Sequence, residues 1–484
     1  MISIDANFVD AAAPNAEAIK NGRTLVLKGA FVKLCQSDDE TLIFGECSGS
    51  GKVPYRCSCD FVRADKPTHR CSCPSRQFPC KHCLGLMYAW VQKKPFAVTE
   101  VPEEISSKRE KMEVREEKKK ERDSQPRQVN TAALAKKIKT QLEALDLLEA
   151  LNRDLVRMGM GNTNIKTAHQ IEEQAKQLGN AYLGGAQSAL LAYTKLFTNA
   201  VGKFDDAASN AKREAVYSEA LDQLTRLHAI VKQGREYLKR RLEDPALAPE
   251  TDTAIAAWLG HAWQLRELKD VGLVQNNVEL VQLTFHSYDD VSRGEFVDTG
   301  IWMNLNTGRI QLTQTFRPYK AVKFIKGEDS FFQVAQIPEL CVYPGDVNPR
   351  IRWESLTPRP LTDADYQRIR NHAQRDLPSL LKEVKSHLKL PLADKRPVHA
   401  VHFQRLGQVD GLIVMEDARG ERLVLTDVGV AEEPPSCYLL KMLPKALLAD
   451  QTLIVRFHHD LDARQLRIKP LAIVTTNAIV RLTL

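Results

Sequence analysis

The stretch CSCPSRQFPCKHC, from Cys71 to Cys83, places four cysteines and one histidine within thirteen residues. The whole chain of 484 residues has ten cysteines, and eight of them lie between Cys35 and Cys83. Ten cysteines are too few for a chain of this length to depend on disulfides, and their concentration in one segment is typical of a metal site. We therefore expect the fold of this region to be built around a metal ion.

The spacing of these residues favours a tetrahedral zinc site with four protein ligands. Two sulfurs on one zinc lie closer together than residues i and i+2 of a flat strand, so a Cys-x-Cys pair needs a bend, which Pro74 and the adjacent serines supply. The second pair directly follows Pro79 and begins an apolar stripe at helical spacing, and the free N–H groups at a helix start favour a thiolate. The predicted ligands are Cys71, Cys73, Cys80 and His82.

A shell of three thiolates and one neutral imidazole has no open position for water, so the single expected zinc ion is structural and not catalytic. Two alternatives stay open at this point: an all-cysteine set that uses Cys57 or Cys59, and no metal at all. Cys57 and Cys59 have apolar, β-prone neighbours and no bend, so both are interpreted as strand residues. Cys83 follows His82 inside the helix, where adjacent residues do not face each other, and is interpreted as a packing residue.

The pattern Cys-x-Cys-x6-Cys-x-His resembles the SWIM zinc finger. The surrounding segments GECSGSGKVPY (45–55) and CSCPSRQFPCKHCLGL (71–86) look like those of a bacterial SWIM family that carries the finger near its N-terminus, and the likeness covers roughly residues 20–95. That family usually has apolar residues where this chain has Cys57 and Cys59. The resemblance implies binding of DNA or protein, and it implies MoxR-type AAA ATPases and von Willebrand A-domain proteins as partners.

Composition and periodicity predict a multidomain α+β protein, since 484 residues are enough for about three domains. The expected parts are a ββα-type SWIM finger, a central helical bundle and a C-terminal β-rich domain with a helical insert. Their predicted bounds are 1–99 for the N-terminal domain with its finger at about 55–94, 100–129 for a charged linker, 130–268 for the helical domain, and 269–484 for the β-rich region with a helix at about 361–388.

Local patterns support these divisions. Residues 103–128 hold nine basic and eight acidic residues, which predicts either a spacer or a solvated helix. Leucines and isoleucines recur at helical spacing from Leu134 to Leu155, and further amphipathic runs are expected at about 166–178, 182–204, 207–242 and 252–268. After about residue 270 the pattern alternates, and NTGR at 306–309 predicts a hairpin turn, so a small barrel or sandwich is expected there. Strands are also expected within 24–47.

Signatures of common catalytic sites are missing, so a non-enzymatic protein is expected. The sequence has no HExxH and no GxSxG, and GSGK at 49–52 lacks the full phosphate-binding pattern. His399 and His402 are three apart on an expected strand and should point to opposite faces. The run His458-His459-Asp460 is interpreted as a polar loop, and His261 as an ordinary helix residue.

Two functions remain open from the sequence: recognition of a protein partner and recognition of nucleic acid. The net charge of +7 is compatible with nucleic acid, and residues 56–94 hold eight Lys or Arg against two Asp, a local charge of +6. A three-thiolate zinc centre itself carries about −1, however, so some of these cations can simply balance it. No apolar run is long enough for a membrane span and no signal peptide is evident, so a cytoplasmic protein that does not bind membranes is expected.

Overall fold

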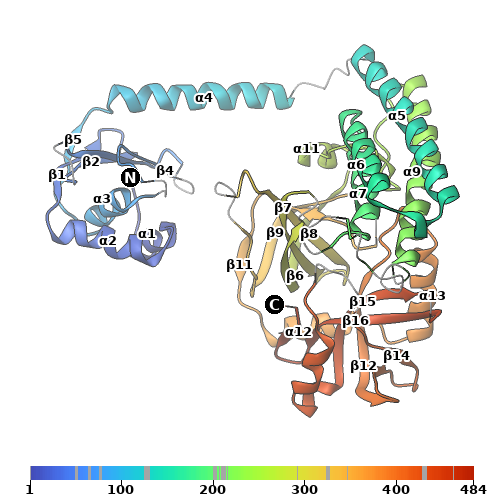
Figure 1. The fold of residues 1–484 in the computed structure, drawn as a ribbon. Coiled ribbons are helices and arrows are strands. Elements are labelled where there is room, and N and C mark those ends of the chain that lie inside the picture. The colour runs from blue at the N-terminus through green and yellow to red at the C-terminus, as the bar shows by residue number, and fades with distance from the viewer. Residues whose placement is uncertain are drawn as a thin grey trace. The chain divides into compact units, whose positions relative to one another are not determined.

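The computed structural model describes residues 2–49, 53–63, 67–75, 79–124, 131–199, 204–205, 208, 214, 216–290, 293–322, 327–345, 347–427, 433–461 and 463–483. The chain divides into two compact units, Met1–Gln128 and Val129–Leu484 (Figure 1). Among the described residues, no helix combines the length and the apolar character that crossing a bilayer requires.

The N-terminal unit is a five-stranded sheet with helices packed against it. The strand order is β4-β3-β2-β1-β5, antiparallel except for the parallel pair of β1 with β5. The expected ββα finger is present as β3, β4 and α3. The elements are α1 (Ala6–Ala12), α2 (Ala16–Leu27), β1 (Phe31–Ser37), β2 (Leu42–Cys47), β3 (Tyr55–Asp60), β4 (Thr68–Cys71), α3 (Lys81–Val91), β5 (Ala97–Thr99) and α4 (Glu103–Ser124).

The expected strand within 24–47 begins later than predicted, because residues 24–27 form the last turn of α2. Asn15 caps that helix by accepting a hydrogen bond from the Ala18 N–H, and Gly29, at φ +61°, reverses the chain after it. Helix α2 then packs closely on α3: a Cβ added to Gly85 would lie 3.2 Å from the carbonyl oxygen of Gly22. The glycines thus allow the two helices to approach more closely than larger residues would.

The start of the charged segment 103–128 is docked onto the finger and does not act there as a spacer. Arg109, on α4, donates hydrogen bonds of 2.9 and 3.0 Å to the carboxylate of Asp60, 2.8 Å to Asp39 and 2.8 Å to the Thr41 hydroxyl. The Asp60 side chain is only 5% exposed. Burial works against ionisation of Asp39, but hydrogen bonds from Ser37, Thr41 and Arg109 outweigh it and hold the pKa of Asp39 well below its usual value.

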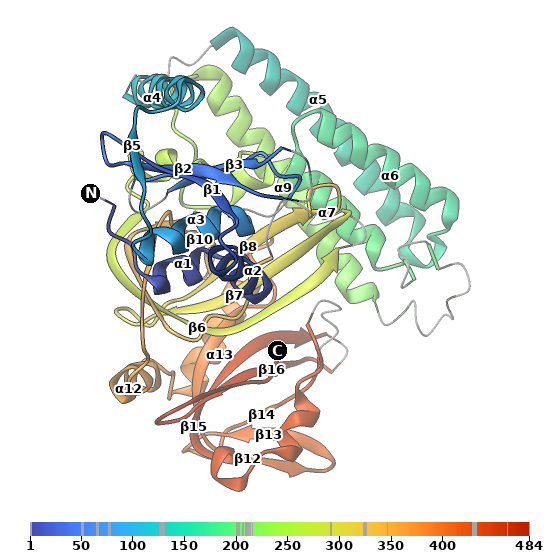
Figure 2. The same cartoon turned by 90° about the vertical axis from the view of Figure 1, so that its left-hand side faces the viewer.

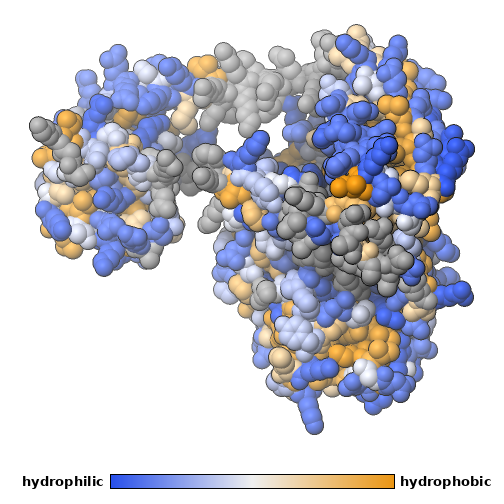
Figure 3. Space-filling model, in the orientation of Figure 1, coloured by the Kyte–Doolittle hydropathy of each residue, from blue (hydrophilic) through white to orange (hydrophobic). Residues whose placement is uncertain are grey.

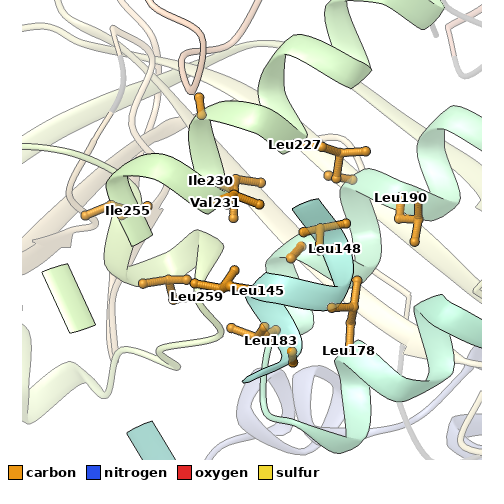
Figure 4. Close-up of a cluster of buried hydrophobic side chains, with 14 of the residues drawn as sticks. Leu145, Leu148, Leu178, Leu183, Leu190, Leu227, Ile230, Val231, Ile255 and Leu259 are labelled. Atoms are coloured by element: carbon orange, nitrogen blue, oxygen red, sulfur yellow. The ribbon is translucent and has the colours of Figure 1, made fainter. Parts of the chain in front are cut away.

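Helices form the first part of the C-terminal unit, and their apolar faces share one core (Figure 4). Leu145 and Leu148 of α5 meet Leu227 and Ile230 of α9 there, as expected for a bundle. The helices are α5 (Thr131–Met158), the 3₁₀ turn η1 (Met160–Asn162), α6 (Ile165–Asn180), α7 (Gly184–Lys195), α9 (Tyr217–Glu243), α10 (Ile255–Trp258) and α11 (Leu265–Asp270).

Two of the expected helical runs differ from the structure. The run 252–268 is two short helices, because Gly260 adopts φ +80° and ends the first of them. A Cβ at Gly260 would lie 2.3 Å from the carbonyl oxygen of Tyr182, so the backbones themselves are in contact at this break. Helix α7 ends at Lys195, before the predicted 204, and most of residues 200–215 lie outside the described part of the chain.

Two six-stranded antiparallel sheets make up the rest of this unit (Figure 2). One has the path β10-β9-β6-β7-β8 with β11 beside β9, and the other is β14-β13-β12-β15-β16-β17. Both sheets are open, since the strand order of each has two end strands. Apolar residues of the two sheets share a core, as in a β-sandwich. The strands are β6 (Val274–Asp290), β7 (Glu295–Asn304), β8 (Ile310–Pro318), β9 (Val334–Val342), β10 (Ile351–Arg352), β11 (Thr357–Arg359), β12 (Val398–Val409), β13 (Leu412–Glu416), β14 (Arg422–Val424), β15 (Ala449–Asp460), β16 (Gln465–Val474) and β17 (Ile479–Arg481).

The helix expected at 361–388 is in fact two helices, α12 (Asp363–Asn371) and α13 (Leu377–Leu388). Between them Gln374 leaves the helical path and pairs with β12: its N–H donates to the Ala400 carbonyl at 2.8 Å, and its carbonyl accepts from the His402 N–H at 2.9 Å. Pro378 then starts the second helix, a position where its missing N–H costs nothing. Two short 3₁₀ turns, η2 (Cys437–Met442) and η3 (Lys445–Leu448), precede β15.

Replacing Arg109 by Ala should loosen α4 from the finger, because Asp60 would lose its main partner inside the unit. We expect the first turns of α4, residues 103–114, to lose about 2 kcal/mol of protection, which is roughly a 30-fold faster amide hydrogen exchange. Lys108→Ala is the matched control, since Lys108 pairs with Glu104, an exposed residue on the same helix. Equal exchange in the two variants would contradict the docking of α4 by Arg109.

Candidate metal centre

The structure brings together the four residues that the sequence singled out. Cys71 is the last residue of β4, Cys73 follows two residues later, Cys80 is the N-cap of α3, and His82 lies in the first turn of that helix. Their ligand atoms all lie within 4.8 Å of one another. The Nδ1 atom of His82 lies 3.7 Å from Sγ of Cys71 and 3.8 Å from Sγ of Cys80.

A two-way hydrogen bond holds the bend between the first two cysteines. The N–H of Ser72 donates to the Arg56 carbonyl at 2.9 Å, and the N–H of Arg56 donates to the Ser72 hydroxyl at 2.9 Å. Ser72 thereby extends the pairing with β3 by one residue, and the chain turns directly after it. Cys71 and Cys73 can therefore turn toward the same point, which a flat strand would not allow.

The second pair depends on the start of α3. Cys80 has extended backbone dihedrals (φ −75°, ψ 168°) and makes no side-chain capping bond, so its sulfur is free to face the other ligands. Hydrogen bonding to the Cys71 thiol, and then to the Cys83 thiol, holds the pKa of Cys80 well below its ordinary value. The His82 ring packs against Tyr55 with ring centroids 5.0 Å apart, which fixes the orientation of the imidazole.

These residues fit one zinc ion. With Zn–S bonds near ~2.3 Å, neighbouring sulfurs of a tetrahedral site lie about 3.8 Å apart and sulfur–nitrogen pairs slightly closer, which agrees with the distances from His82. Three thiolates and a neutral imidazole are also a ligand set that zinc prefers. Bound there, zinc would join the end of β4 to the start of α3 and supply no open position for chemistry.

The other cysteines of the region are occupied elsewhere. Cys57 lies opposite Cys71 in the β3–β4 pair, and its thiol donates to the Gly45 carbonyl at 3.6 Å. Cys59 donates to the carbonyl of Cys83 at 3.6 Å. Burial raises the pKa of Cys57 and of Cys59. Both are thus placed as the strand interpretation expects.

Two features of the site were missed by reasoning from the sequence. Cys83 is not only a packing residue, because its Sγ lies 3.8 Å from Sγ of Cys80, and the signal for this was the i, i+3 spacing of the two residues. The second feature is a cleft of about 580 Å³ beside the metal centre, lined by residues that include Asn15, Glu17, Asn21, Tyr55, Cys73 and Lys81. These come from four separate segments, so no local pattern could reveal the cleft.

The remaining candidate residues of the sequence do not form a second centre within the described part of the chain. His399 packs edge-on against Phe457, with its pKa lowered to about 4 by burial, while His402 pairs with Asp450 at 3.3 Å. His458 and His459 belong to β15, so the polar-loop interpretation is wrong.

Two further predictions concern GSGK and His261. His261 lies beyond the helix break and pairs with Glu267 at 2.9 Å, so it is not the helix residue that was expected. Of the GSGK segment, residues 50–52 lie outside the described residues.

Comparison with protein families finds one match: the model of the SWIM zinc finger aligns with residues 55–90. This range covers β3, β4 and α3 up to its last residue but one, and it includes all four ligand candidates. No match to the chain was found among curated proteins or among solved structures. The match therefore concerns the finger, and it says nothing of the 356 residues from 129 to 484.

Elemental analysis of three variants tests the ligand set. Wild-type protein should hold one zinc per chain, and Cys80→Ser should hold little, because structural zinc can contribute ~10–16 kcal/mol that a shell short of one thiolate largely loses. Cys57→Val and Cys83→Ser should both keep the metal. Full occupancy in Cys80→Ser would refute the proposed ligands, and zinc loss in Cys57→Val would favour the all-cysteine alternative.

Proposed function

We propose that the chain is a non-enzymatic, zinc-binding interaction protein whose N-terminal unit recognises a protein partner through the cleft beside the metal centre. The cleft is the observation that carries the proposal. Its volume of about 580 Å³ lies in the usual range of binding sites. A metal ion bound to the four ligands would hold one wall of the cleft rigid, since Cys73, Cys80 and His82 all line it.

The lining suits a polypeptide segment. Amide and carboxylate groups of Asn15, Glu17 and Asn21 line it together with the aromatic ring of Tyr55 and the prolines Pro14 and Pro74. Such a mixture offers hydrogen-bond donors and acceptors beside apolar surface, as protein-binding sites do. On the face of the N-terminal unit visible in Figure 3, hydrophilic residues predominate and hydrophobic ones are scattered, so a shaped cleft is a better recognition feature there than a large apolar patch.

Charge in the cleft argues against nucleic acid as its occupant. Glu17 contributes −1, Lys81 contributes +1, and a zinc centre with three thiolates contributes about −1, which leaves the lining at about −1. Phosphates require a net positive surface. Some of the basic residues that suggested DNA binding are also engaged within the unit: Arg70 lies 3.4 Å from Asp60, and Arg56 lies 3.9 Å from Glu104.

The identity of the partner is a proposal that rests on the resemblance to the bacterial SWIM family. MoxR-type AAA ATPases and von Willebrand A-domain proteins are the first partners to test. Within this proposal the helical and β-rich parts of the second unit act as a separate folded body with its own cores. A cytoplasmic location is part of the same proposal.

A photo-activated cross-linker placed at Asn21 tests the cleft whichever protein the partner is. In native extract, zinc-loaded protein should form a protein adduct that disappears on chelation, because the cleft wall depends on the metal. The same cross-linker at Glu100, an exposed residue just after β5, serves as the matched control and should not form that adduct. Adducts with nucleic acid at position 21 would favour the alternative function instead.

Reversing one charge separates the two partner classes. Glu17→Lys turns the lining from about −1 to about +1, so binding of a protein partner should weaken by about tenfold, or ~1.4 kcal/mol, whereas binding of DNA should strengthen. Glu100→Lys makes the same change in net charge away from the cleft. Gel shifts on duplex and single-stranded DNA at ~50 mM salt and titrations with the captured protein measure both. Protein binding that is unchanged in Glu17→Lys, together with DNA binding of the unaltered protein that this substitution changes and Glu100→Lys does not, would overturn the protein assignment.

A further inference from the structure

The Cys83 thiol touches the metal centre without belonging to it. Its Sγ lies 3.8 Å from Sγ of Cys80 and 3.4 Å from the carbonyl oxygen of Arg70, and the side chain is fully buried. Cys83 is not part of the four-residue cluster whose ligand atoms lie within 4.8 Å of one another. With metal bound to the other four residues, Cys83 is therefore a spare thiol in contact with a ligand sulfur.

The positions of the two cysteines on α3 suit a covalent bond between them. Cys80 is the N-cap and Cys83 is the third helical residue, so both lie on the same face of the first turn. A disulfide needs a sulfur–sulfur distance near ~2.05 Å, about 1.8 Å shorter than the observed contact. Small side-chain rotations at the N-terminal end of the helix, where the N-cap residue is outside the helical hydrogen-bond pattern, can supply this movement.

One residue of the pair borders the cleft, although its side chain is buried. Cys80 lines the cleft described above, whereas Cys83 lies on the interior side of it and does not line the cleft. The geometry thus combines a cysteine in the wall of a cleft with a second thiol in contact with its sulfur. Redox-sensitive cysteines often lie next to a second thiol that can resolve the oxidised sulfur.

We propose that Cys80 and Cys83 form a peroxide-sensitive dithiol, and that its oxidation to a disulfide releases the metal from the finger. The Cys80 thiolate attacks hydrogen peroxide, so that a sulfur–oxygen bond forms, the oxygen–oxygen bond breaks and hydroxide leaves. Cys83 then attacks the Cys80 sulfur; the disulfide forms, the sulfur–oxygen bond breaks, and the Cys83 proton leaves with that oxygen as water. One thiolate and one thiol are oxidised, and one peroxide is reduced to one water and one hydroxide, which takes a proton from the solvent to become the second water.

The consequence for the site follows from the number of donors. Once Cys80 is bonded to Cys83, the shell retains only Cys71, Cys73 and His82, and the charge of the donor set falls from −3 to −2. A thiol reductant restores both sulfurs and with them the four-ligand site. The proposal rests on the four zinc ligands and not on the identity of the partner. Its test therefore does not depend on whether the cleft recognises a protein.

Full-length, zinc-loaded protein treated with hydrogen peroxide tests the proposal with two measurements. A chromogenic chelator should report one zinc released per chain, and a reductant should allow zinc to rebind. Non-reducing tryptic digestion should give two peptides joined by a disulfide, because cleavage after Lys81 separates Cys80 from Cys83. Protein that keeps its zinc, or a disulfide that joins Cys80 to Cys71 or Cys73 instead, would overturn the proposal.

Variants at Cys83 separate the spare thiol from the ligands. Cys83→Ser and Cys83→Ala should each bind one zinc but lose the joined peptide and the reversible release of zinc. Cys59→Ser, which changes a neighbouring buried thiol, is the matched control and should behave like wild type. Zinc release that is unchanged in both Cys83 variants would show that Cys83 takes no part. Failure of both variants to bind zinc would show that Cys83 is itself a ligand, which also overturns the proposal.

Discussion

The meeting of three cysteine sulfurs and one imidazole between β4 and α3 is the constraint on which the N-terminal unit depends. Every residue from His82 to Ala89 is buried, so α3 is the centre of the core and not a helix on its surface. A helix with no polar face cannot be positioned by amphipathic packing alone. The ligands at its first turn fix where it starts and which way it points, and the glycine contact with α2 fixes how closely its neighbour lies.

A second constraint joins α4 to this core. Arg109 reaches Asp60 at the end of β3 and Asp39 in the turn between β1 and β2, so one guanidinium connects two parts of the sheet with the helix that follows it. An ion pair this little exposed gains little net stability over an apolar contact, but its loss leaves a buried charge without its partner. The pair therefore specifies where α4 lies more than it adds stability. The segment 103–128 has too few apolar residues to form its own core, but Arg109 fixes the position of its first turns.

The four candidate ligands, which lie together in the structure, could be chosen from the sequence because the information for them is local. Four ligands lie within twelve residues, and both the bend after β4 and the helix start after Pro79 have their own signals. Predictions failed where a distant contact decided the outcome. Nothing near 24–27 distinguishes the end of α2 from a strand, and Gly260 ends a helix because its backbone meets that of Tyr182. The single helix expected at 361–388 is divided because Gln374 pairs with β12.

The difference between local signals and distant contacts also applies to the surroundings of the four ligands, which the ligand pattern does not indicate. A tetrahedral shell is complete with four donors, so the pattern alone predicts an inert cross-link. The fold places a cleft against Cys73 and Cys80 on one side and the Cys83 thiol against Cys80 on the other. Cys80 is thus the one ligand that both surroundings share. Cys80 is also the N-cap of α3. Cys80 therefore belongs at once to the candidate metal site, to the wall of the cleft and to the start of the buried helix α3.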